Sequence, residues 1–187
     1  NYIATVMLWK YPEYMKVLGF IMILGISVIV MSCNDRKESL DLLAAIDKEK
    51  IDVVRELLDS GIDPNKRAVP EGIPLEGAYP LHLAIVKGNK EIVQILLANG
   101  AQLDLEAKNK DEATPLHWAA FFGQTDMVSL LIQSGAPMNL LDANNNTPLD
   151  AAVYVWKLSK DDEGKSKHMK AIIDILKSNG GKPADDL

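Results

Sequence analysis

Apolar and polar positions divide the chain near residue 33. Residues 17–31 form an apolar run without a charged side chain, whereas everything after Asn34 mixes apolar and polar positions. In that second part, apolar residues recur three and four positions apart, as in Ile92, Val93, Leu96 and Leu97. This spacing is typical of helices that bury one face. The pattern therefore predicts an apolar N-terminal segment followed by a series of amphipathic helices.

The apolar N-terminal run has the features of a secretory signal. As a helix, residues 17–31 would reach about 22 Å, short of the roughly 30 Å hydrocarbon core of a bilayer. Lys16 precedes the run, and the small residue Ser32 ends it just before Cys33. A basic start, a short apolar stretch and a small residue at the cut are typical of a secretory signal. An uncleaved membrane anchor is the alternative interpretation.

Residues 15–33 resemble a bacterial lipoprotein signal, with a lipobox that ends at Cys33. The resemblance implies that Cys33 is diacylated on sulfur and becomes the new N-terminus after cleavage. Residues 1–33 are then an upstream extension plus the signal, with Met7 or Met15 as the start. The implied location is the bacterial cell envelope, where the protein is lipid-anchored to a membrane and faces the periplasm or the exterior.

The rest of the chain repeats itself. Residues 79–101 and 114–136 align without gaps, and 35 residues separate His82 from His117. A further copy begins at Asn146 and closes at Gly181, and a degenerate copy occupies residues 39–65. Self-similarity at a fixed period indicates a repeat protein, because each unit alone cannot bury its apolar face.

The spacing of roughly 33 residues, with T-P-L-H at the head of the copy that begins at Thr114 and Y-P-L-H at the head of the copy that begins at Tyr79, resembles the ankyrin repeat. The resemblance implies an all-α fold, a solenoid of about four helix-turn-helix repeats joined by β-hairpin loops. After the signal, the predicted parts are a linker (34–38), a repeat domain (39–181, with repeats at about 39–65, 78–104, 113–139 and 146–181) and a tail (182–187).

Capping residues and glycines explain why these segments fold as helix pairs. Thr114 and Thr147 can accept a hydrogen bond from the first free backbone N–H groups of a helix. Gly88 and Gly123 can end the first helix of a repeat, because glycine adopts the left-handed conformation without steric cost. Tyr79 replaces the capping threonine of the second repeat. We therefore expect the second repeat to be the weakest.

Three departures from the repeat are informative. Glu49 stands where the first copy should have its mid-repeat glycine. Residues 66–77 exceed the usual connection between repeats, and their prolines and glycines indicate a loop. The last copy is also too long, with the excess around residues 157–167. We expect a lengthened first helix and a charged, projecting loop there.

Composition and charge narrow the possible partners. The formal net charge is −6 at pH 7 with a pI of about 5.1, and an acidic protein neutralises a phosphate backbone poorly. We therefore do not expect the protein to bind nucleic acid. One cysteine allows no intramolecular disulfide framework, and three histidines leave little for a zinc site. We expect a monomer that needs no metal, cofactor or disulfide to fold.

The sequence does not support catalysis. His82 and His117 occupy the T-P-L-H position, where the ankyrin resemblance implies hydrogen bonds between neighbouring hairpins. His168 is expected at the surface, and the acidic residues 161–163 lack the pattern of a calcium loop. Glycine-rich phosphate loops, zinc-binding patterns and paired catalytic carboxylates with a nucleophile are not found. The chain is therefore not expected to be an enzyme.

The ankyrin resemblance also implies a concave protein-binding surface near the end of each first helix. Exposed aromatic side chains mark interfaces, since they lose much apolar area and little entropy on binding. The alternative is that Phe121 packs under the loop and Trp156 covers the last repeat. Trp118 is left out of the predicted surface, because its place inside the first helix indicates packing within the repeats. The predicted surface residues are Val86, Lys87, Phe121, Phe122, Val153, Tyr154 and Trp156.

These observations predict a membrane-tethered ankyrin-repeat protein that mediates protein–protein interaction in the bacterial cell envelope. The partner is an unidentified protein, because a repeat scaffold fixes the shape of a surface and leaves its specificity to variable positions. Two alternatives remain open at this point. The chain could be a structural or accessory envelope lipoprotein, or an immunity-type inhibitor of a toxin or enzyme.

Overall fold

The computed structural model describes residues 42–66 and 68–187. These residues belong to a compact unit that spans Ser39–Leu187. Cys33, the predicted signal and the linker 34–38 lie outside the described residues.

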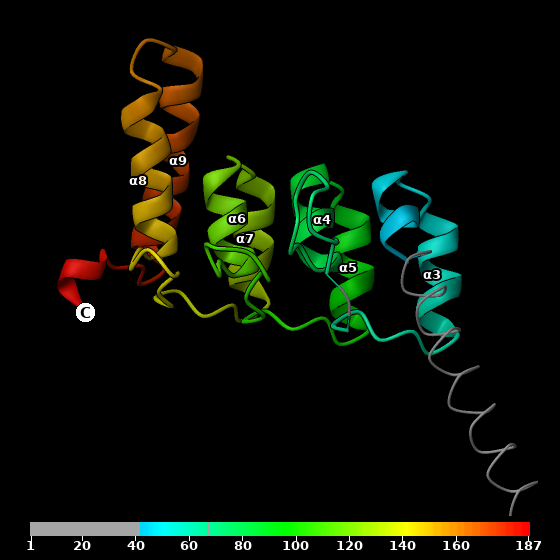
Figure 1. Cartoon of the computed structure of the whole chain (residues 1–187). Coiled ribbons are helices and arrows are strands. Elements are labelled where there is room, and N and C mark those ends of the chain that lie inside the picture. The colour runs from blue at the N-terminus through cyan, green and yellow to red at the C-terminus, as the bar shows by residue number, and fades with distance from the viewer. Residues whose placement is uncertain (1–41, 67) are drawn as a thin grey trace, which may run out of the picture. The chain divides into compact units, whose positions relative to one another are not determined.

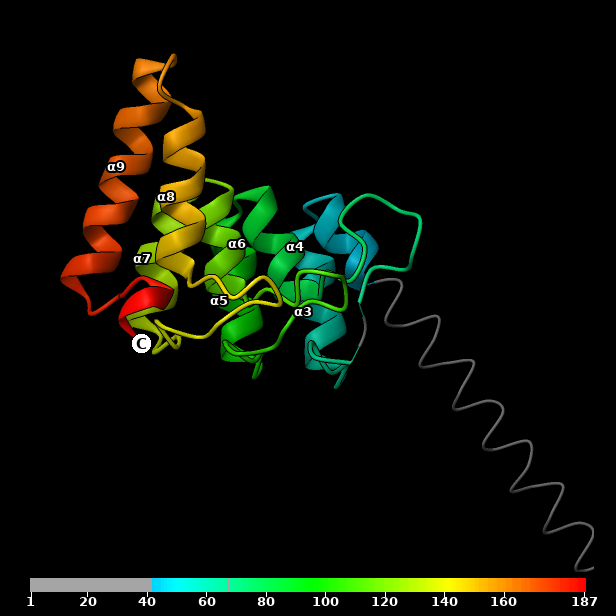
Figure 2. The same ribbon diagram turned by 60° about the vertical axis from the view of Figure 1, so that its left-hand side comes forward.

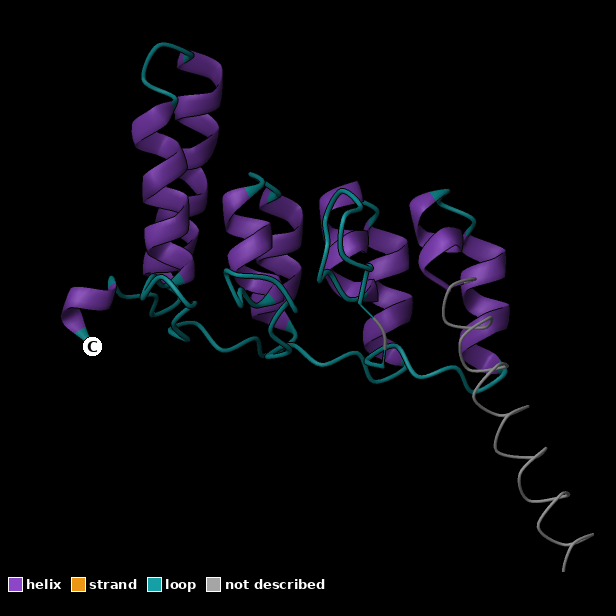
Figure 3. Ribbon diagram, in the orientation of Figure 1, coloured by secondary structure: helices purple, strands orange, loops and turns teal. Residues whose placement is uncertain are grey.

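The described chain folds into four successive helix pairs (Figure 1). Helical residues 42–47 precede α3 (Ile51–Asp59). The next pairs are α4 (Pro80–Lys87) with α5 (Lys90–Ala98), α6 (Pro115–Phe121) with α7 (Thr125–Gln133), and α8 (Pro148–Leu158) with α9 (Glu163–Ser178). A short 3-10 helix, η1 (Ala184–Asp186), follows. Figure 3 shows helices and loops but no strand in this part of the chain, which confirms the all-helical prediction.

Neighbouring pairs stack side by side in chain order. α4, α6 and α8 contact their own partners α5, α7 and α9, and they also contact one another in sequence. Among the second helices, α5 packs against α3 and α7 packs against α9. The long connections gather at one end of the pairs (Figure 1). The arrangement is a helical repeat solenoid, in which each pair buries its apolar faces against its neighbours.

Small residues on the first helices let neighbouring pairs approach closely. Ala84, Ala119, Ala120 and Ala152 are completely buried. The second helices contribute larger aliphatic side chains to the same continuous core, and the fully buried ones include Ile92, Leu96, Leu131, Ile172 and Leu176.

The connections between repeats are not the β-hairpins that we expected. Each has hairpin-like backbone bonds, for example Ala107 N to Ala113 O at 3.0 Å, but no strand forms in the described residues. The physical reason lies at the tips. The Asn109 side chain accepts the N–H groups of Asp111 and Glu112, each at 3.1 Å, in competition with strand pairing.

The caps and glycines at the helix ends follow the prediction, and the unusual case is Glu49. Thr147 accepts a hydrogen bond from the N–H of Asp150 at 3.2 Å, whereas Tyr79 makes no side-chain cap bond. Gly88 has the predicted left-handed conformation, with φ at 70°. Glu49 holds the corresponding place in the first pair with φ at 51°, a conformation that is strained for a residue with a Cβ.

The insertion in the last repeat is mostly helix (Figure 2). α8 has 11 residues and α9 has 16, against seven to nine in α3 to α7. The first helix is lengthened as predicted, but the projecting loop shrinks to residues 159–162. Asp162 explains the difference, because its side chain caps α9 by accepting the N–H of Lys165 at 2.9 Å. Across residues 42–66 and 68–187, every helix is too short or too polar to cross a membrane.

Candidate protein-binding site

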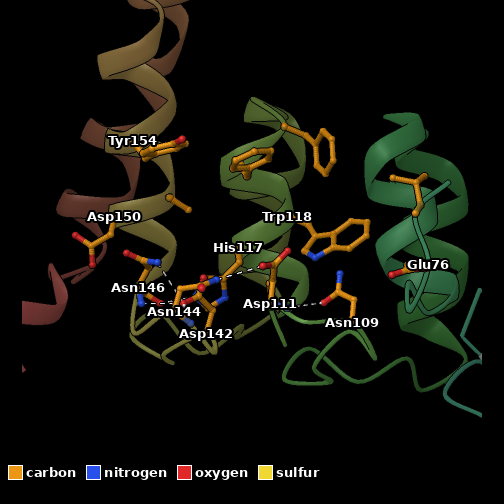
Figure 4. A pocket seen from close by; sticks show the side chains of 15 residues that line it. Glu76, Asn109, Asp111, His117, Trp118, Asp142, Asn144, Asn146, Asp150 and Tyr154 are labelled. Carbon is orange, nitrogen blue, oxygen red and sulfur yellow. Dashed lines mark hydrogen bonds between the residues drawn. The ribbon is translucent and has the colours of Figure 1, made fainter. Parts of the chain in front are cut away.

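A groove of about 710 Å³ lies where α6 and α8 meet the tips of the connections (Figure 4). Its apolar side comes mainly from the two helices, and its polar side comes from the connections that precede them and from Asp150 in the first turn of α8. We call it the aromatic groove. It is lined by Leu75, Glu76, Asn109, Asp111, Ala113, His117, Trp118, Phe121, Phe122, Asp142, Asn144, Asn146, Asp150, Ala151 and Tyr154.

Four aromatic side chains line the helical side of the groove. Phe121, Phe122 and Tyr154 are 46%, 42% and 57% exposed, while Trp118 is buried at 7%. Phe122 stands between Trp118 and Phe121, with ring centroids 5.7 and 5.4 Å apart. Phe121 is thus open to solvent and does not pack beneath a loop. Phe121, Phe122 and Tyr154 therefore each leave about half of their surface in the groove open to solvent, where a partner could cover it.

The other four residues of the predicted surface lie elsewhere. Val86 is partly buried and packs against the cluster that contains Trp118. The Lys87 ammonium pairs with the Asp47 carboxylate at 2.7 Å. Val153 and Trp156 are partly buried against the main core, so Trp156 does cover the last repeat. A role in partner binding stays a prediction for all seven residues.

A set of carboxylates on the polar side of the groove was not singled out from the sequence. Glu76 and Asp111 are exposed, and Asp142 and Asp150 are half-buried. Neighbouring tips are joined, since the N–H of Ala143 donates to the carbonyl of Asp111 at 2.9 Å. A usable signal exists in the sequence, because Asx residues recur at matching positions before each T-P-L.

Two buried histidines join successive repeats behind the groove. The Nε2–H of His82 donates to the Ala113 carbonyl at 3.1 Å, and that of His117 donates to the Asn146 carbonyl at 3.0 Å. The Nδ1 of His117 meets the Thr114 hydroxyl at 2.8 Å. Their structural role, which the sequence predicted, is thus visible in these bonds.

His82 lacks the second partner that His117 has. Its Nδ1 is buried without a hydrogen bond in the described structure, because Tyr79 offers no nearby hydroxyl. Burial lowers the pKa of His82 to about 4. The hydrogen bond to the Ala113 carbonyl raises this pKa, and the nearby His117 ring lowers it further. Burial also lowers the pKa of His117. Both rings are therefore neutral at pH 7 and ill suited to general acid catalysis.

The remaining polar candidates do not assemble a reactive site. His168 is exposed, as expected, and its Nε2 bonds to the Gly123 carbonyl at 2.6 Å, which ties α9 to the α6–α7 turn. The acidic residues 161–163 are exposed around the α8–α9 turn. In the described parts of the chain, no three His, Cys, Asp or Glu residues lie together as metal ligands would.

The fold and the groove define a helical repeat protein with a surface suited to binding other proteins. A family model of ankyrin repeats in three copies matches residues 42–142 and 81–160, so the chain belongs to the ankyrin-repeat family. A search of curated proteins found no significant match. Ankyrin repeats typically act as non-enzymatic interaction modules, and the family therefore indicates a role in protein–protein interaction.

Proposed function

We propose that this protein is a monomeric, membrane-tethered interaction module that binds a partner protein in the aromatic groove. The observation that supports the proposal most is the exposure of Phe121, Phe122 and Tyr154 within one groove. Aromatic side chains supply much apolar contact area and lose few rotamers on binding, which is why they dominate the energetics of interfaces.

The rigidity of the groove also favours binding. Phe121 and Phe122 sit at the end of α6, and Tyr154 projects from the next first helix, α8. α6 and α8 pack directly against each other, so a partner meets a surface that is already ordered. Preorganised side chains cost less entropy on association than flexible ones.

The tether rests on Cys33 and the apolar run before it. Each buried methylene of an acyl chain contributes about 0.8 kcal/mol, so two chains hold a protein firmly at a membrane. On this proposal the module works in the bacterial cell envelope. Metabolic labelling with a fatty-acid analogue tests the tether: wild type takes up label, and Cys33→Ser remains an unlabelled, larger precursor. Label that persists in Cys33→Ser would rule the tether out.

Capture from detergent-solubilised envelope extract tests the binding role. The full chain, tagged at its C-terminus, should retain one stoichiometric partner. Phe122→Ala and Tyr154→Ala should each weaken that complex at least tenfold, the usual cost of losing an aromatic anchor. Val53→Ala is the matched control, because Val53 is 41% exposed on α3, outside the groove.

The possible outcomes separate the candidate functions. Broad, salt-sensitive association without a stoichiometric partner supports the accessory envelope role instead. A partner that is an enzyme or toxin and loses activity in the complex identifies an inhibitor that acts through the same groove. Unchanged affinity in folded Phe122→Ala and Tyr154→Ala variants contradicts the placement of the binding site.

A further inference from the structure

We infer that the aromatic groove takes a cationic peptide segment. A Lys or Arg side chain of the partner meets the carboxylates on the polar side, and an adjacent apolar side chain packs on the aromatic side. This inference rests on the proposed function and names the chemistry of the partner segment.

The charges that line the groove all have one sign. Four carboxylates contribute to the lining, while no Lys or Arg belongs to it within the described structure. Two nearby lysines are engaged elsewhere: Lys108 lies over the Tyr79 ring at 5.8 Å, and Lys87 pairs with Asp47. The lining itself therefore carries only negative charge, with the exposed Lys110 beside Asp111 on the same tip but outside the lining. A cleft lined by one sign of charge attracts ligands of the other sign.

The two inner carboxylates are held in place by one oxygen each. Asp142 Oδ1 accepts the N–H of Asn146 at 2.8 Å. Asp150 Oδ2 accepts the N–H of Ala184 at 2.8 Å and also the N–H of Thr147 at 3.0 Å. The other oxygen of each carboxylate makes no hydrogen bond with the described residues and can accept one from a ligand. Half-buried charges of this kind interact more strongly than fully solvated ones.

The two outer carboxylates are fixed in the same manner. Glu76 Oε2 accepts the N–H of Gly72 at 3.1 Å, and Asp111 Oδ1 accepts from the Asn144 side-chain amide at 3.2 Å. Figure 4 shows Asp111 and Asp142 on neighbouring tips, facing the groove between Trp118 and Tyr154. A guanidinium or ammonium group that enters here meets acceptors that are already ordered. Little conformational entropy is therefore lost at these carboxylates on binding.

The apolar side of the groove favours a partner segment that also carries a large apolar side chain beside its cation. Tyr154 is followed one turn later on the same face of α8 by Leu158, which is 68% exposed. α8 has 11 residues and so spans about 16 Å. An extended segment of about five residues covers that length. Aromatic faces beside the cation add a cation–π attraction. An acidic segment would instead meet like charges at the tips and be rejected.

Selection from a displayed library of random decapeptides tests the inference. The full chain is the bait, and the enriched peptides are counted again on Phe122→Ala and on the control Val53→Ala. We expect peptides with net positive charge and at least one aromatic or large aliphatic residue, retained by Val53→Ala and lost on Phe122→Ala.

Failure of this inference differs from failure of the proposed function. If enriched peptides depend on Phe122 but are neutral or acidic, the groove remains the binding site and the cationic inference is overturned. If no enriched peptide depends on Phe122, both are overturned.

Affinity measurements on the enriched peptides assign the charges. Asp111→Asn and Asp142→Asn keep the oxygen that accepts the structural hydrogen bond and remove the charge. We expect each to weaken binding about threefold and the pair about tenfold, and wild-type affinity to fall as salt rises. Asp161→Asn, at an exposed acidic residue of the α8–α9 turn, should have no effect. Equal affinities in all these variants would overturn the assignment.

Discussion

Acidification should destabilise this protein through one buried ring, His82. Its pKa is about 4 in the folded state, mainly because burial disfavours the charged form, against 6.5 for an exposed histidine. As the pH falls below 6.5, the unfolded chain binds a proton at this site before the folded chain does. The contribution of His82 to the free energy of unfolding is therefore fully present above pH 6.5 and is lost as the pH falls toward 4.

The size of this effect follows from the difference between the two pKa values. One pKa unit corresponds to about 1.4 kcal/mol, so this site alone costs about 2 kcal/mol at pH 5 and about 3 kcal/mol at pH 4. His117, whose pKa is also lowered by burial, adds a loss in the same direction. A typical domain has only about 5–15 kcal/mol to lose, so the effect is measurable.

Urea denaturation followed by far-UV circular dichroism at pH 7, 6, 5 and 4 is the assay. His82→Gln can keep a donor toward the Ala113 carbonyl and cannot titrate, so its stability should fall by about 3 kcal/mol less than wild type over this range. Val53→Ala, at an exposed side chain that cannot titrate, is the control and should keep the pH dependence of the wild type. Parallel pH profiles for wild type and His82→Gln would refute the reasoning.

Three further substitutions test local features of the repeats by the same denaturation assay. Glu49→Gly should stabilise the first repeat by up to about 1 kcal/mol, because φ at 51° is strained for any residue with a Cβ and the bond that is lost, from the Asn89 amide to the Glu49 carboxylate at 3.0 Å, is exposed to solvent; a loss of stability would contradict this. Gly77→Ala should destabilise by more than about 1 kcal/mol, since its Cβ would lie 2.4 Å from the Lys108 backbone; a neutral result would show that the connection can move. Thr147→Ala should cost about 1–2 kcal/mol, because the hydroxyl caps α8 and also bonds to the Lys182 carbonyl at 2.8 Å; a cost below 0.5 kcal/mol would show that neither bond contributes.

The helix pairs could be predicted because the repeat carries its own boundary signals. Proline after the cap position begins each first helix after the first pair, and Gly88 and Gly123 occur where the chain reverses. Glu49 shows the limit of this logic. The repeat pattern identifies the position, and the surrounding structure imposes the left-handed turn even on a residue that disfavours it.

The connections and the insertion were harder to predict because side chains compete with the backbone there. The Asn109 amide occupies N–H groups that a hairpin would need, and Asp162 starts a helix inside a stretch that composition alone marks as loop. Such outcomes depend on single hydrogen bonds, which neither periodicity nor composition reports.

The candidate site was predicted in part. Phe121 and Tyr154 share a groove because their repeat positions correspond, each seven residues after the threonine that precedes its helix, which an alignment of repeats can show. The place of Asp111 and Asp142 on that same groove depends on how the tips fold back over α6 and α8. Spatial proximity of this kind arises from tertiary structure and has no simple sequence period.

Photo-crosslinking from the edge of the aromatic groove tests the central claim most directly. A benzoylphenylalanine in place of Leu158 stands one turn beyond Tyr154 on α8, at a side chain that is 68% exposed and outside the groove lining. The same label in place of Val53 reports on α3. With the partner captured from envelope extract, we expect a crosslink from position 158 and none from position 53. A crosslink from position 53 alone would contradict it.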